Sequence, residues 1–149
     1  MRHPGRAVDT VENLMKLDDV IDTVRNAVPE CLAAGVVDLA TGMLLAVRVD
    51  GDRSGSDLDL LASTAEMLFQ GSRLPQLAQA FSEGEGESAV HDVVVVSEGA
   101  AFIFQRCRRR PGVAVITVSR ASANLGMVLA RARQSLASVE SVLVASLAP

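Results

Sequence analysis

The sequence has few aromatic side chains: four Phe and no Trp or Tyr among 149 residues. Because proteins that bind single-stranded nucleic acid stack bases on aromatic rings, this scarcity argues against such binding. The net charge of −4 argues equally against a surface that coats nucleic acid. We therefore expect no nucleic-acid partner, and a core built from Val, Leu, Ile, Ala and Met.

Cysteine and long apolar runs are also scarce. Cys31 and Cys107 are too few for a disulfide framework or a zinc site, and we predict that both are reduced core residues of a cytosolic protein. No apolar run approaches the roughly 18 residues that a membrane span needs. The start, MRHPGRAVD, has positive charge but no apolar stretch behind it, so we do not expect a signal peptide. The predicted location is cytoplasmic, without membrane insertion.

The common sequence patterns of catalysis and of ligand binding are missing. The sequence has no glycine pattern of the dinucleotide or P-loop kind, and no nucleophile elbow surrounds Ser119 or Ser122. The acidic loop DGDRSGSD lacks the central Gly and the terminal Glu of an EF-hand. We expect no cofactor, no metal ion and no catalytic site.

What the sequence does contain is enough apolar residues for one folded domain. Hydrophobic residues make up 49% and charged residues 21%, which excludes general disorder. Lys16 is the only Lys; this preference for Arg, with the richness in Ala and Val, hints at a GC-rich bacterial genome. We predict a loose tail over residues 1–8 and a single domain over residues 9–149.

The first third of the chain predicts a helix and a hairpin. Apolar residues recur at steps of three and four from about Thr10, and Pro29 ends this helix near Ala27. Two apolar runs, Cys31–Asp38 and Met43–Val49, then predict strands joined by a tight turn.

A second helix is predicted after the acidic loop, with Ser56 as N-cap and with Asp57 and Asp59 in its first turn. One face is apolar, and the opposite face is small and only mildly polar, so we expect both faces to be covered. Gly71 and Pro75 favour a break, although LAQAF would allow the helix to continue. The apolar face consists of Leu58, Leu61, Ala62, Ala65, Leu68 and Phe69.

Three strands are predicted between Val90 and Val118. A two-residue turn at Glu98-Gly99 pairs Ser97 with Ala100 and hence His91 with Arg106. Both faces of the resulting sheet are apolar, so something must cover each of them. One face carries Val93, Val95, Phe102 and Phe104, and the other carries Val94, Val96 and Ile103.

The same register separates the one candidate nucleophile from its base. Cys107 falls on the side of Val90, whereas His91 shares the side of Arg106. A slip of one residue would bring the thiol and the imidazole together. We predict a core thiol beside a histidine at the rim.

The second hairpin has a concentrated positive charge: Arg106, Arg108, Arg109 and Arg110, ahead of a predicted type II turn at Pro111-Gly112. Two interpretations remain open. The cluster is either a solvated hairpin tip or a contact for acidic side chains, phosphate or lipid headgroups, which the guanidinium fork suits.

A last helix follows, with Ser119 or Ser122 as its cap. Its apolar stripe comprises Leu125, Val128 or Leu129, Ala132, Leu136, Val139 and Leu143. The predicted element order is α-β-β-α-β-β-β-α.

This order resembles that of the roadblock / dynein light-chain family. GVVDLATGMLLAV is similar to the family's first hairpin, and ASANLGMVLARAR, with Ala123, Asn124, Leu125 and Gly126, resembles the start of its last helix. The resemblance extends from about Thr10 to Val144. It implies an α+β fold in which a five-stranded antiparallel sheet has helices on both faces, the first and last helices together on one of them.

The resemblance also implies partners. The second helix would pair with its mate in a homodimer, and the sheet would extend across both subunits. Family members, the bacterial MglB-like proteins among them, bind and regulate Ras-like small GTPases and have no catalytic site of their own. We therefore expect a non-enzymatic regulator of a bacterial Ras-like GTPase, with a structural adaptor that leaves nucleotide hydrolysis unchanged as the alternative. The expected dimer contacts are Leu61, Thr64, Ala65, Leu68 and Phe69, and the expected partner contacts are Arg106, Arg108, Arg109 and Arg110.

Overall fold

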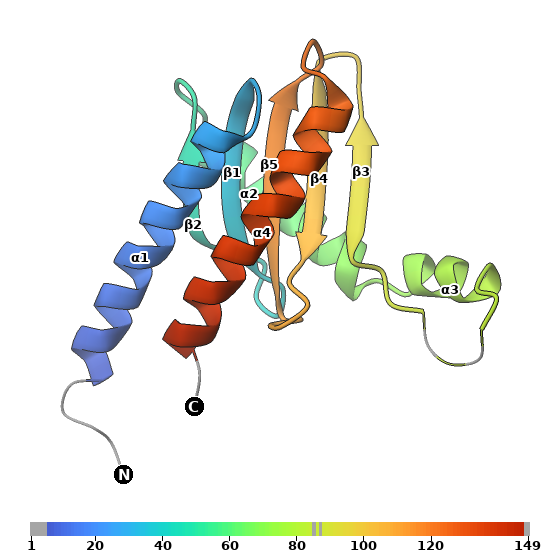
Figure 1. Ribbon diagram of the computed structural model, residues 1–149, viewed down its shortest axis with the longest axis horizontal. Coiled ribbons are helices and arrows are strands. Elements are labelled where there is room, and N and C mark those ends of the chain that lie inside the picture. The colour runs from blue at the N-terminus through green and yellow to red at the C-terminus, as the bar shows by residue number, and fades with distance from the viewer. Residues whose placement is uncertain (1–5, 85, 87, 148–149) are drawn as a thin grey trace.

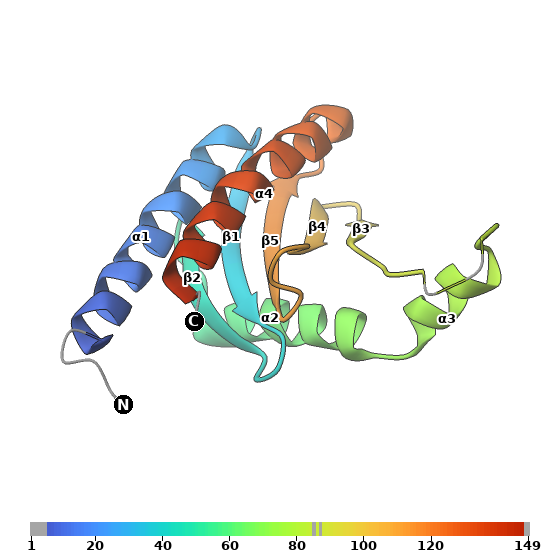
Figure 2. The same cartoon turned by 60° about the horizontal axis from the view of Figure 1, so that its bottom comes forward.

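The structure, a computed structural model, describes residues 6–84, 86 and 88–147. Within them, five strands form one antiparallel sheet, helices α1 and α4 lie on one of its faces, and α2 lies on the other (Figures 1 and 2). The predicted fold and element order are confirmed, with one short helix, α3, added after α2. The elements are α1 Arg6–Ala27, β1 Cys31–Asp38, β2 Met43–Val49, α2 Gly55–Gln70, α3 Arg73–Ala80, β3 Asp92–Val96, β4 Ala100–Arg106, β5 Val113–Arg120 and α4 Leu125–Leu147.

The strands lie in the order β2-β1-β5-β4-β3, so β1 and β5 pair near the middle of the sheet and β2 and β3 form its edges. The predicted hairpin register is confirmed: the Ser97 amide donates to the Ala100 carbonyl at 2.9 Å, and the Arg106 amide donates to the His91 carbonyl at 2.7 Å. The predicted alternation of faces follows from this register, since Phe104 lies in one core cluster and Ile103 in the other.

Each face of the sheet has its own apolar core. The α1/α4 core contains Ile21 and Val139 from the helices and Val36, Ile103 and Val115 from the sheet. The α2 core is smaller and has two small helical residues at its centre. It is built around Ala62, Ala65, Phe69, Val37, Phe104 and Ile116. The small side chains bring α2 close to the strands. Val90, expected on the Cys107 side, packs in the α2 core instead, because it precedes β3 and so does not follow the strand's alternation.

Both predicted helix caps differ from those in the structure. Ser54, not Ser56, caps α2: its side-chain oxygen accepts from the Asp57 amide at 3.1 Å. Asn124 Oδ1 accepts from the Met127 amide at 3.1 Å and caps the start of α4. Ser119 cannot act there because it lies buried within β5.

The turns are placed as predicted, with one difference in type. Gly42 has a φ of +70°, which suits glycine. In the β4–β5 turn, the Val113 amide donates to the Arg110 carbonyl at 2.9 Å and closes the turn around Pro111-Gly112. Gly112 is not among the residues with positive φ, so the type II prediction was wrong.

Helix α1 overlaps the end of the predicted tail. Helix α1 begins at Arg6, two residues before the end of the predicted tail, and ends at Ala27 ahead of Pro29 as expected. Residues 1–5 lie outside the described residues, and the predicted domain boundary stays a prediction. None of the helices in the described part is long and apolar enough to cross a membrane.

Candidate interaction surface

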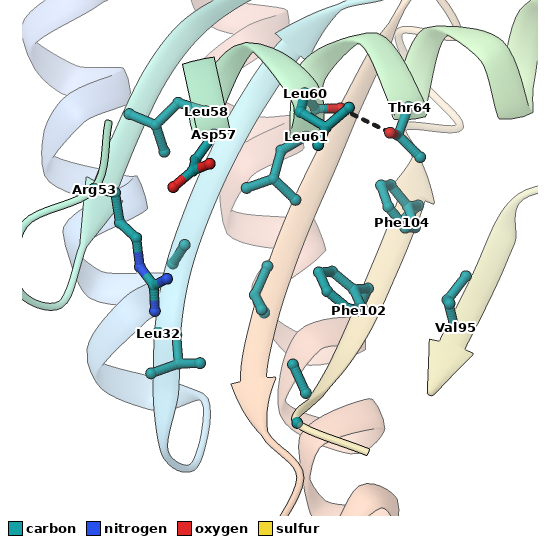
Figure 3. Close-up of a pocket in the computed structure, with 14 residues that line it drawn as sticks. Leu32, Arg53, Asp57, Leu58, Leu60, Leu61, Thr64, Val95, Phe102 and Phe104 are labelled. Carbon is teal, nitrogen blue, oxygen red and sulfur yellow. Dashed lines mark hydrogen bonds between the residues drawn. The ribbon is translucent and has the colours of Figure 1, made fainter. Parts of the chain in front are cut away.

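A wide apolar groove lies between α2 and the sheet. The C-terminal half of α2 packs closely through Ala65 and Phe69, whereas its N-terminal half stands over a cavity of about 580 Å³ (Figure 3). Phe102 and Phe104 of β4 form part of its floor. The full lining is Leu32, Ala33, Arg53, Asp57, Leu58, Leu60, Leu61, Thr64, Val95, Gly99, Ala100, Phe102, Phe104 and Val118. An apolar groove of this size is typical of a surface that binds a ligand or another protein.

The groove reaches the open edge of the sheet at β3. This strand is hydrogen-bonded to β4 on one side only, and Val94, Val95 and Val96 are 39%, 42% and 61% exposed. An edge strand presents unpaired backbone groups that can template another strand. Three exposed valines in a row make this edge apolar as well as open, which is unusual for a surface that stays in water.

The five predicted dimer contacts divide into two groups. Ala65 and Phe69 are 0% and 5% exposed and belong to the subunit's own core. Leu61 and Leu68 are partly buried against that core, and Thr64 lines the groove, where its hydroxyl donates to the Leu60 carbonyl at 2.7 Å (Figure 3). Buried side chains cannot contact a second molecule unless the subunit unfolds. We therefore remove Ala65 and Phe69 from the predicted dimer contacts.

Two exposed residues on α2 were missed. Leu60 is 65% exposed and Met67 is 64% exposed. They flank Thr64 at helical spacings of four and three, and this stripe on the outer face was the signal that could have identified them. The outward surface of α2 therefore carries Leu60, Thr64 and Met67.

The four arginines of the predicted cluster do not form one binding site, because Arg106 makes different contacts from the others. The Arg106 guanidinium donates to the Phe69 carbonyl at 2.8 Å and lies 5.1 Å from the centre of the Phe69 ring. It thus provides a cation and a donor at the C-terminal end of α2, where helix carbonyls lack partners. Arg106 therefore contributes to the fold of the subunit through its contacts with Phe69.

The remaining arginines belong to the β4–β5 turn. Arg108 and Arg109 are exposed, and Arg110 is half-buried. The Arg109 amide donates to Oε2 of Glu140 at 2.9 Å, so a nearly buried carboxylate of α4 holds the turn in place. Arg108 and Arg109 are the members of the cluster that a partner could contact.

The cysteines are poor candidates for chemistry. Cys107 is 0% exposed in the α1/α4 core, whereas Arg106 lies on the α2 face, as the register predicted. Burial, and then the charge of Glu140, raise the pKa of the Cys107 thiol to about 12. Burial also raises the pKa of Cys31. A thiol with a raised pKa is not the thiolate that a nucleophile requires at neutral pH.

Metal-binding side chains do not gather in the part of the chain that the structure describes: no three His, Cys, Asp or Glu residues there could hold an ion. Gln105, Thr117 and Ser119 are buried without a side-chain hydrogen bond. By strand alternation they share the α1/α4 face with Ile103 and Val115.

Comparisons with known proteins identify the fold through structure alone. No family model and no curated protein matches this sequence. Solved structures do match. An MglB with a tetrameric arrangement superposes with a TM-score of 0.74 at 15% identity, over 90% of this chain and 92% of that chain. The gliding protein MglB from Thermus thermophilus gives a TM-score of 0.72 at 16% identity, over 87% of this chain and 90% of that chain.

A third match carries the family name. The Roadblock/LC7 domain from Streptomyces avermitilis superposes with a TM-score of 0.67 at 16% identity, over 85% of this chain and 97% of that domain. The match includes nearly all of the domain, so the likeness extends to the whole sheet and its helices. The resemblance predicted from the sequence is confirmed at the level of the fold, and the chain has the roadblock fold.

Proposed function

We propose that this protein is a homodimeric, non-enzymatic regulator that binds a Ras-like small GTPase and modulates its nucleotide state. The observation that carries the proposal is the open apolar surface on the α2 side, which runs from the groove to Val95 on the exposed β3 edge. A single subunit leaves this surface in water. The shared fold with MglB proteins supports the same conclusion.

A two-fold dimer would cover the surface. Pairing β3 with its mate would satisfy the open backbone edge, and it would place the two α2 helices side by side with Leu60 and Met67 between them. The interface then contains apolar side chains at its centre and charged residues such as Asp57 at its rim, which is the usual composition of a protein interface.

Regulation of a GTPase requires contacts rather than chemistry from this chain. Arg108 and Arg109 project from the β4–β5 turn, which the Glu140 carboxylate holds in place. Guanidinium groups on a fixed turn can bind acidic side chains or phosphate by paired hydrogen bonds. We assign them as the partner contact, with Arg106 removed from the predicted set.

The test begins with the oligomeric state and continues with the GTPase. Light scattering at micromolar concentration should give twice the subunit mass. The purified protein should then retain a Ras-like GTPase loaded with a GTP analogue in preference to the GDP form, and should change its rate of GTP hydrolysis. Equal capture of both forms with an unchanged rate would indicate the structural adaptor instead.

A charge reversal at the turn tests the assigned contact. The R108E/R109E variant should lose GTPase capture while remaining a dimer. R131E is the matched control, because Arg131 is an exposed arginine on α4, away from the turn. Capture that survives R108E/R109E would contradict the assignment.

A further inference from the structure

Helix α3, Arg73–Ala80, stands apart from the rest of the subunit. It contains no buried residue and lies past the β3 edge, in the same layer as α2 (Figures 1 and 2). A second groove, of about 670 Å³, separates it from Leu68 and Phe69 at the end of α2. One hydrogen bond, from the Ser88 amide to Oε1 of Gln79 at 3.0 Å, ties the helix to the segment that leads to β3.

This helix is amphipathic, and most of its apolar stripe is uncovered. Leu74, Leu77, Ala78 and Phe81 follow one another at steps of three, one and three, so they share a face. Leu77 is 57% exposed and Phe81 is 82% exposed. A helix of eight residues is too short to be stable alone in water, so its apolar stripe indicates a docking partner.

We propose that α3 is an arm that docks in the α2-side groove of a second copy of this chain, with Leu77 and Phe81 as its anchors. The inference rests on the proposed homodimer and specifies how that dimer is held. Each subunit would provide one arm and one groove, so the exchange is reciprocal and closes on itself under two-fold symmetry.

The arm cannot fill the groove of its own subunit. The groove lies under the N-terminal half of α2, from Asp57 to Thr64, whereas α3 begins after the other end of this helix. Gly71 and Ser72 are the whole connection and extend by only about 7 Å. Helix α2 has 16 residues, a length of about 24 Å. An occupant of the groove must come from another molecule.

Two-fold symmetry about β3 brings the partner's groove to the arm. The groove lies over the end of the sheet near Gly99, whereas α3 lies beyond the opposite end of β3, at the lower right in Figure 1. A half-turn about an axis beside the middle of β3, between this strand and its mate, exchanges these two ends. It places the groove of the partner subunit where the arm projects, on the same side of the sheet.

The charges at the two surfaces agree with this placement. Asp57 lies on the rim of the groove, at the N-terminal end of α2, and Arg73 begins the arm after the C-terminal end. The groove is also lined by Arg53, so it offers side chains of both signs. In an antiparallel pair of α2 helices, Arg73 of one subunit lies on the side of Asp57 of the other, and this pair is attractive in both halves of the dimer.

Removing the two anchors tests the arm. In the L77S/F81S variant the dimer dissociation constant, measured by sedimentation equilibrium, should rise by about tenfold or more, because buried aromatic and aliphatic anchors dominate interface affinity. M43S is the matched control: Met43 is 64% exposed on the far edge strand β2, and its loss should leave the constant unchanged. Circular dichroism should be the same for all three proteins, because α3 contributes no buried residue.

Crosslinking tests where the arm docks. A subunit with Leu77→Cys is mixed with a subunit carrying Leu60→Cys, since Leu60 lines the groove and is exposed. Mild oxidation should give a covalent heterodimer, above the background that the wild-type cysteines produce. Absence of this product would overturn the proposed docking site.

The outcomes separate the arm from the dimer. A wild-type protein that is monomeric at tens of micromolar overturns both the homodimer and the arm. A wild-type dimer whose affinity survives L77S/F81S overturns the arm alone. Loss of GTPase capture with unchanged self-association also overturns it, and would assign α3 to the GTPase instead.

Discussion

Arg106 joins the sheet to the end of α2, and its role depends on two contacts with the same residue. Its guanidinium donates to the Phe69 carbonyl at 2.8 Å and lies over the Phe69 ring. The first contact satisfies a helix carbonyl that has no partner within the helix, and the second is a cation–π interaction. An arginine that sequence alone assigns to a basic surface is thereby part of the α2 core.

Replacing Arg106 should therefore cost stability. The variant Arg106→Met keeps an apolar stem but loses the hydrogen bond and the charge, and its free energy of unfolding should fall by about 1–2 kcal/mol. Urea titration followed by circular dichroism measures the change. Arg108→Met, at an exposed position nearby, is the control and should stay within about 0.5 kcal/mol of wild type. Equal stability of the two variants would contradict the capping role.

Cys107 gives the protein a dependence on alkaline pH. Its thiol has an ordinary pKa of 9.0, which the fold raises to about 12. Above pH 9 the unfolded chain loses this proton and the folded chain keeps it, so folding stability is complete below pH 9 and falls between pH 9 and pH 12.

The variant Cys107→Ala removes this dependence, although it loses some stability by leaving a cavity. The stability advantage of wild type over the variant should shrink by about 1 kcal/mol between about pH 8 and pH 10. Urea titrations at the two pH values measure it. A constant or growing advantage would show that the thiol does not stay protonated in the folded state.

The end of α2 decides where the arm projects. The Gly71 amide still donates to the Met67 carbonyl at 3.0 Å, but the chain leaves the helix there with extended backbone angles, and α3 starts two residues later. A Cβ at Gly71 would lie 2.6 Å from that same carbonyl oxygen, closer than side chains approach backbone. Pro75, within the first turn of α3, needs no amide hydrogen bond.

Gly71→Ala should accordingly shift the backbone and lower the free energy of unfolding by about 1 kcal/mol or more. Gly55→Ala is the matched control at the other end of the same helix. Nothing lies within 4 Å of its added Cβ, and alanine should be neutral or stabilise by about 0.4–1 kcal/mol. Thermal unfolding of both variants at one protein concentration distinguishes the two effects; a Gly71→Ala variant as stable as wild type would mean that the break tolerates a side chain.

Strands and their pairing were predictable from sequence, and helix caps were not. Cys31–Asp38 and Met43–Val49 have the predicted bounds because turn-forming residues delimit them. The cap of α2 is one of two serines, Ser54 and Ser56, that lie two residues apart and have the same capping chemistry. Which of them caps the helix depends on how the loop packs, and a local pattern does not contain that information.

At the scale of the whole molecule, the sequence assigned the residues of the interaction surface on α2 only in part. One face of this helix is apolar and packs on the sheet, but the opposite face is small and only mildly polar, so the sequence does not separate core contacts from contacts with a second subunit. Ala65 and Phe69 were assigned to the interface and are in the core, whereas Leu60 and Met67 were not assigned and are exposed. The groove depends on how α2 crosses the sheet, a tertiary property without a sequence motif.

The β3 edge yields a prediction at the same scale. Val95→Lys puts a charge on an exposed edge position that also lines the groove, and lysine on an edge strand opposes pairing with another strand. The dimer dissociation constant should rise by about tenfold or more, by sedimentation equilibrium. Met43→Lys on the opposite edge strand is the control, and a similar loss of affinity in both variants would argue against β3 as the seam.

The pairing of β1 with β5 has a consequence for synthesis of the chain. These neighbouring strands are Cys31–Asp38 and Val113–Arg120. The first strand to be synthesised therefore cannot complete its pairing until the last strand has been made. Until β5 has left the ribosome, β1 has β2 on one side and an open apolar edge on the other. Such long-range pairing slows folding and exposes intermediates to aggregation. We therefore expect the nascent chain to complete its sheet only after its final strand has emerged.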